Sequence, residues 1–108
     1  MRKTCCAGAL ACGLWTVCLP QAWAHGYEPF GRCAHQDAKT IRCTGGMDGR
    51  LLPGLRIDVL ADDGDRILVR GRLDAQGAFA FEKPAVPFYV LIEAKPGKTV
   101  EIDDGEIK

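Results

Sequence analysis

The chain contains no serine, which excludes catalysis by a serine nucleophile. Its 14 basic residues equal its 14 acidic residues, and no basic cluster provides an electrostatic basis for binding nucleic acid. The sequence also lacks the run of roughly 20 apolar residues that a helix needs to span a bilayer. Internal repeats and long stretches of helical periodicity are absent as well. These absences favour a small β domain.

Residues 1–24 have the pattern of a secretory signal peptide. Arg2 and Lys3 precede an apolar run at 5–19, and small residues follow at Ala22 and Ala24. We expect cleavage after Ala24, a periplasmic or secreted location, and no membrane anchor in the mature protein. A lipoprotein is a weaker alternative, because no convincing lipidation box precedes a cysteine of this segment.

Of the six cysteines, only Cys33 and Cys43 lie beyond the expected cleavage site. An oxidising compartment favours a disulfide between them. Closing so short a loop stabilises a small domain by roughly 3 kcal/mol in the chain-entropy model. A thiol metal site or redox site is the alternative, but the two cysteines do not have the spacing of a CxxC motif.

The stretch 54–95 organises the remaining domain, which spans 25–108. It contains four runs of strand-type residues separated by turn signals. Aspartate and glycine mark the turns at 62–65 and 74–77, where glycine provides the positive φ of a tight turn. This pattern predicts consecutive antiparallel strands.

Alternation within these runs assigns side chains to faces. Ile57 and Val59 alternate with charged residues, which is typical of a half-buried strand. In the following run we expect Ile67, Val69 and Leu73 to share one face.

The later runs are more apolar. Phe79 and Phe81 are expected to point together, and the run 87–95 is typical of a central strand covered on both sides.

The margins of the domain add shorter elements. A strand is expected around 40–43 and another at 99–103, whereas Pro29 and Gly31 favour irregular structure over 25–37. The prediction is a single all-β domain of about seven strands, an antiparallel sandwich of immunoglobulin or transthyretin type.

Candidate metal ligands are few. Cleavage after Ala24 would leave His25 with its α-amine and imidazole on one residue, a pair that suits nickel or copper. His35 and Glu101 are further candidates, and a frayed terminus without a metal is the alternative for His25. The acidic runs at 62–65 and 101–106 do not match a calcium loop and are better explained as turn residues and solvated charge.

Residues 44–107 resemble the carboxypeptidase-regulatory-like, transthyretin-type β domains of bacterial exported proteins. The similarity rests on DGRLLPG at 48–54, DAQGAFAF at 74–81 and the apolar strand that contains Tyr89. More narrowly, the chain is similar to small periplasmic proteins that accompany nickel and cobalt uptake systems. That resemblance implies a mature chain beginning with His25, a bound nickel or cobalt ion, and a metal-transport membrane component as partner. Where those proteins have a Gly-His pair this chain has Gly97 and Lys98, and a protonated lysine does not ligate a metal.

The sequence is compatible with three functions. The leading expectation is a non-enzymatic exported accessory protein associated with nickel or cobalt uptake. The alternative is a protein- or glycan-binding module without a metal, for which Tyr27, Phe30 and Tyr89 would form an exposed aromatic patch. A small hydrolase is the third, and it would require converging carboxylates. We expect the functional residues at the new amino terminus and in the loop after Ala94.

Overall fold

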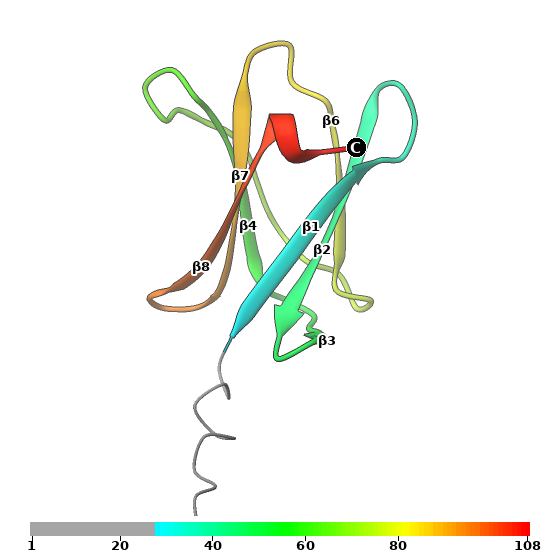
Figure 1. Ribbon diagram of the computed structural model, residues 1–108, viewed down its shortest axis with the longest axis vertical. Helices are drawn as coiled ribbons and strands as arrows, with labels where there is room; N and C mark the ends of the chain where they lie inside the picture. The colour runs from blue at the N-terminus through cyan, green and yellow to red at the C-terminus, as the bar shows by residue number, and fades with distance from the viewer. Residues whose placement is uncertain (1–27) are drawn as a thin grey trace, which may run out of the picture.

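The computed structural model describes residues 28–108, which form two facing antiparallel sheets (Figure 1). The first sheet comprises β1 (Pro29–His35), β2 (Thr40–Met47), β3 (Arg50–Leu51) and β6 (Ala78–Glu82). The second comprises β4 (Arg56–Ala61), β5 (Ile67–Arg72), β7 (Phe88–Lys95) and β8 (Lys98–Asp103), in the order β5-β4-β7-β8. A 3-10 helix, η2 (Asp104–Glu106), follows β8. The prediction of an all-β antiparallel sandwich is confirmed; its described part has eight strands, of which β3 has only two residues.

The predicted signal peptide, His25 and Tyr27 lie outside the described residues. Within residues 28–108, no helix has the length and hydrophobicity required to cross a membrane.

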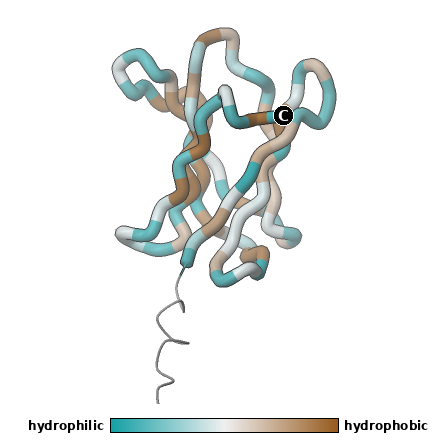
Figure 2. The backbone as a smooth tube through the Cα atoms, in the orientation of Figure 1, coloured by the Kyte–Doolittle hydropathy of each residue, from teal (hydrophilic) through white to brown (hydrophobic). Residues whose placement is uncertain are grey.

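The core lies between the two sheets. Alternating side chains point inward along each strand, and hydrophobic residues follow the strands while most turns are hydrophilic (Figure 2). The most completely buried side chains are Ile41, Cys43, Ile57, Val59, Val90 and Ile92. The inward positions predicted for Ile57 and Val59 are confirmed.

Strand β1 corrects the prediction of irregular structure over 25–37, as far as this segment is described. β1 pairs with β2 along its whole length, from Pro29 opposite Met47 to His35 opposite Ile41. Pro29 is tolerated because it is the first residue of the strand. Gly31 allows the sheets to approach closely, since a Cβ atom there would lie 2.8 Å from Cδ1 of Ile92. Pro29 and Gly31 were expected to indicate irregular structure, but each of them occupies a position in β1 that a strand tolerates.

A second correction concerns β5. Leu73 is buried and Val69 is half-buried as expected, but Ile67 is 49% exposed. The register of β4 against β5 shifts between Val59 and Leu60, which places Ile67 opposite Leu60. A one-residue shift changes which face a side chain occupies, so simple alternation fails beyond it.

Strand β7 is central, between β4 and β8, as predicted. Its other predicted property, cover on both faces, is wrong. Phe88, Val90 and Ile92 are buried on the inner face, whereas Tyr89 and Leu91 are half-buried on the outer face. The outer side chains are shielded by neighbours within the sheet, and none of the described elements forms a layer over them.

Aromatic rings connect the two layers. Phe79 and Phe81 point together as predicted, with ring centroids 6.4 Å apart. Phe81 also meets Phe88 of the opposite sheet edge to face, with centroids 6.3 Å apart. Phe79 packs over Gly71 of β5, where a Cβ atom would lie 2.6 Å from its Cζ atom.

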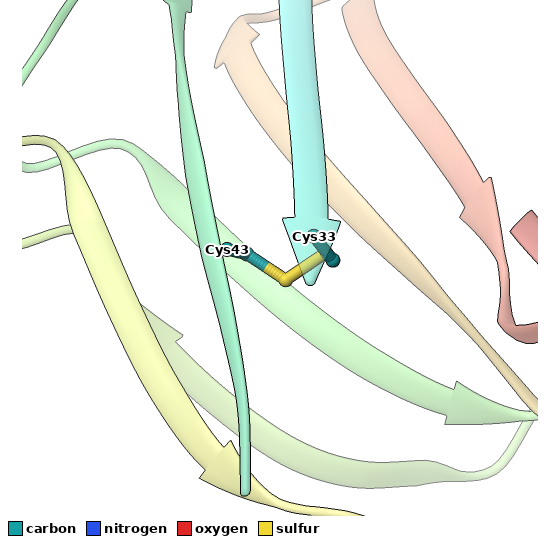
Figure 3. Close-up of a disulfide and its surroundings, with 2 residues drawn as sticks. All are labelled: Cys33 and Cys43. Atoms are coloured by element: carbon teal, nitrogen blue, oxygen red, sulfur yellow. A yellow bond between two sulfur atoms is a disulfide. The ribbon is translucent and has the colours of Figure 1, made fainter. Parts of the chain in front are cut away.

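The predicted disulfide between Cys33 and Cys43 is present (Figure 3). The two residues lie directly opposite each other in the β1–β2 register, and both are buried. Because the bond joins neighbouring strands of one sheet, it fixes their register from within the core.

Candidate functional site

The predicted metal ligands are not gathered by the described structure. His25 lies outside it, His35 is exposed at the end of β1, and Glu101 is exposed on β8. Among residues 28–108, no group of three or more histidine, cysteine, aspartate or glutamate side chains is positioned to hold a metal ion. Both described cysteines are in the disulfide and provide no thiolate. A metal function therefore rests on His25.

The candidate aromatic residues are also separated. Phe30 precedes Gly31, which faces the opposite sheet, so Phe30 lies on the outer face of the first sheet. Tyr89 lies on the outer face of the second sheet, where its hydroxyl donates a 2.8 Å hydrogen bond to Oδ1 of Asp65. Phe30 and Tyr89 thus do not form a common patch.

That hydrogen bond to Asp65 is the main reason why the pKa of Tyr89 is raised to about 12; desolvation and nearby carboxylates contribute in the same direction. On the same sheet face, Arg70 donates to both carboxylate oxygens of Asp58, at 3.0 and 3.3 Å, which raises the pKa of Arg70. These contacts are paired within the sheet and need no ligand to explain them.

The loop after Ala94 is a tight turn between β7 and β8. Beside it, a hollow of about 360 Å³ is bordered by Arg56, Arg72, Glu93 and Lys95. Arg72 donates to the Gly54 carbonyl at 3.0 Å, and Arg56 lies 3.8 Å from Glu93. Its two arginines therefore already have partners within the protein.

A better candidate lies at the end of the sandwich that carries η2 and the carboxyl terminus (Figure 1). We name this hollow of about 260 Å³ the end pocket. The residues around it are His35, Ile41, Lys83, Pro84, Ala85, Val86, Pro87, Phe88, Asp104, Gly105 and Ile107. Its floor is apolar and buried, whereas Val86 on the β6–β7 connection is 40% exposed.

Hydrogen bonds between distant segments hold the walls of the end pocket. Asp104 accepts from the Phe88 amide through Oδ2 at 3.1 Å, which ties η2 to the start of β7. The His35 amide donates to the Lys108 carbonyl at 2.9 Å, and the Lys83 amide donates to the Lys39 carbonyl at 2.8 Å. A pocket framed in this way is formed before any ligand arrives, which lowers the entropic cost of binding.

The side chains around the end pocket are suited to binding a ligand. Lys83 and His35 supply cationic or hydrogen-bonding groups at its border, and Asp104 is already an acceptor for a backbone amide. A pocket with an apolar floor and a few polar groups suits one apolar side chain of a ligand.

Sequence reasoning placed His35 among the candidates but missed the β6–β7 connection as a site. The signal was Val86 between Pro84 and Pro87, an apolar residue in a rigid connection. In Figure 2 this connection includes hydrophobic residues, unlike the hydrophilic β4–β5 turn at the same end of the molecule.

No protein-family model and no curated protein sequence matches the chain. A solved structure of alpha-2-macroglobulin from Escherichia coli, spanning domains NIE-MG1, is similar, with a TM-score of 0.64 and 20% sequence identity. The match covers 73% of this chain and 38% of the macroglobulin chain. At that identity the likeness shows the fold alone, an immunoglobulin-like β-sandwich. The narrower resemblance to carboxypeptidase-regulatory-like domains and to nickel and cobalt accessory proteins stays a prediction.

Proposed function

We propose that the chain is a non-enzymatic accessory module of the periplasm or extracellular space, which docks a protein partner through the end pocket. The observation that carries this proposal is the preformed hollow with its buried apolar floor of Ile41, Phe88 and Ile107, and with Val86 exposed at its border. An exposed apolar residue beside a buried apolar floor is typical of an anchor site in a protein interface.

Two parts of this proposal, the export of the protein and its non-enzymatic role, are supported by other observations. The signal-peptide pattern at 1–24 and the Cys33–Cys43 disulfide both suit an oxidising compartment. A non-enzymatic role is favoured because serine is missing from the chain and the disulfide occupies the two described cysteines.

A photoreactive residue at position 86 tests the docking. The variant with this residue in place of Val86 is expressed as the full chain in cells and illuminated. We expect it to form one defined covalent adduct with a protein partner, which mass spectrometry identifies. Leu51 is the matched control, because it is 50% exposed and lies on β3 at the other end of the sandwich (Figure 1). Identical adducts from both positions, or none from position 86, would overturn the proposal.

The second candidate function is an accessory role in nickel or cobalt uptake, with a metal-transport membrane component as partner. It is favoured by the position of His25 directly after the expected cleavage site, where amine and imidazole form a compact chelate. His35 and Glu101 are both exposed but lie on different strands, β1 and β8, so His25 carries this candidate role. Titration of the processed protein with Ni²⁺, Co²⁺ and Cu²⁺ tests this role. Equal affinity in a His25→Ala variant would exclude it.

A further inference from the structure

A second hollow adjoins the end pocket on the outer face of the first sheet. It measures about 240 Å³, and we name it the arginine hollow. The residues around it are Arg32, Ala34, His35, Gln36, Arg42 and Thr44. His35 borders both hollows, so one ligand segment of a few residues is long enough to reach both.

The β1–β2 register explains the shape of the arginine hollow. Arg32 lies opposite Thr44, and Ala34 lies opposite Arg42. The two arginines are therefore diagonal neighbours, with a small side chain opposite each. The register thus places two long cationic side chains on one face of the sheet, each opposite a small residue.

The charges of the arginine hollow are unbalanced. None of its bordering residues is acidic, and Glu82, which lies opposite Thr40 on the neighbouring strand, does not border it. Within residues 28–108, neither Arg32 nor Arg42 has an ion pair or a side-chain hydrogen bond. In contrast, Arg70 is bonded to Asp58.

Arginine is well suited to carboxylate recognition, because its planar guanidinium donates two parallel hydrogen bonds to the two oxygens. We propose that the arginine hollow binds a carboxylate side chain of the same partner segment whose apolar side chain occupies the end pocket. This inference rests on the proposed function and names the partner's chemistry: an extended peptide in which an apolar residue adjoins acidic residues.

The disulfide on the core side of the first sheet fixes the spacing of the two arginines. Cys33 lies between Arg32 and Ala34, and Cys43 lies between Arg42 and Thr44. Side chains alternate along a strand, so the disulfide faces the core while the arginines face outward. The disulfide thus holds the two strands that carry the arginine hollow.

Two matched peptides test the inference, acetyl-Leu-Glu-Glu-amide and acetyl-Leu-Gln-Gln-amide, titrated into the isotope-labelled processed protein and followed by NMR amide shifts. We expect the acidic peptide to bind about fivefold more tightly, a value in the range of exposed charge pairs. Its advantage should shrink as salt is added, because salt screens exposed charges.

Arg42→Gln should reduce the preference for the acidic peptide, because only Arg32 then remains to pair with a carboxylate. Arg50→Gln is the control, because it removes the same charge from an exposed residue of β3, opposite the far end of β2, and should leave the preference intact.

Equal binding of the two peptides at the end pocket would overturn the inference and leave the proposed function standing. Shifts confined to the arginine hollow, with none around Val86 and Ile107, would instead refute docking at the end pocket. Binding of neither peptide would overturn both statements.

Discussion

Breaking the Cys33–Cys43 disulfide should lower the free energy of unfolding by about 3 kcal/mol. The bond joins residues ten positions apart, and the chain-entropy model gives this magnitude for closing so short a loop in the unfolded chain. A domain of this size has a net stability of roughly 4–12 kcal/mol, so the bond supplies a large share of it. The midpoint of thermal unfolding should fall by roughly 12–24 °C.

The assay compares the oxidised and the reduced protein, which have the same side chains and differ only in the bond. Far-UV circular dichroism follows unfolding in denaturant, because both tryptophans, Trp15 and Trp23, precede the expected cleavage site. A Cys33→Ala/Cys43→Ala variant is the control, since a reductant should not change its stability. A loss of less than about 1 kcal/mol on reduction would refute the entropic reasoning.

Two further predictions concern packing and ionisation. Gly71→Ala should destabilise the domain by about 1–3 kcal/mol in a denaturant titration, because the added Cβ atom would lie 2.6 Å from Cζ of Phe79. Gly105→Ala is the control and should be nearly neutral, because its added Cβ atom meets open space. Equal effects of the two substitutions would contradict this account. The hydrogen bond from the Tyr89 hydroxyl to Asp65 should stabilise the fold fully below about pH 10, the pKa of a tyrosine in the unfolded chain. This stabilisation should disappear as the pH rises through about 12, the pKa of Tyr89 in the folded protein. Asp65→Asn keeps a residue that tolerates the positive φ of 53° and should return the pKa of Tyr89 toward its ordinary value. Ultraviolet titration of the phenolate, in a variant without the other tyrosine, measures this, and an unchanged midpoint would refute the role of Asp65.

The turns could be predicted from the sequence because their causes are local. Gly64 and Gly77 both adopt positive φ, +76° in each case, in the turns assigned to 62–65 and 74–77. Asp74 also accepts hydrogen bonds from the amides of Gln76 and Ala78 through its side chain, as an aspartate at the start of a turn commonly does.

Features that depend on partners distant in sequence were not predictable in this way. β1 exists because β2 pairs with it, and the residues around Pro29 carry no local signal for a strand. Ile67 is exposed because the register shifts at Leu60, which alternation within one strand does not reveal. The end pocket combines segments around His35, Lys83 and Asp104, so only the folded chain brings its walls together.

The β1–β2 register is held by both the disulfide and the packing of the core. A slip of one residue between β1 and β2 would turn one of the two strands over and bring either Arg32 or Arg42 to the core face, so the arginine hollow requires this register. The disulfide fixes the register covalently, but the complete burial of Ile41 and Cys43 also favours it, because turning β2 over would expose them.

We therefore expect reduced protein that is still folded to keep its preference for the acidic peptide, although it unfolds at a lower denaturant concentration. The peptide titration repeated with reductant, below the unfolding transition, measures this. If the preference disappears while the circular dichroism is unchanged, core burial does not hold the register and the bond itself positions the two arginines. Retained preference would assign the disulfide to stability and the packing of β2 to recognition.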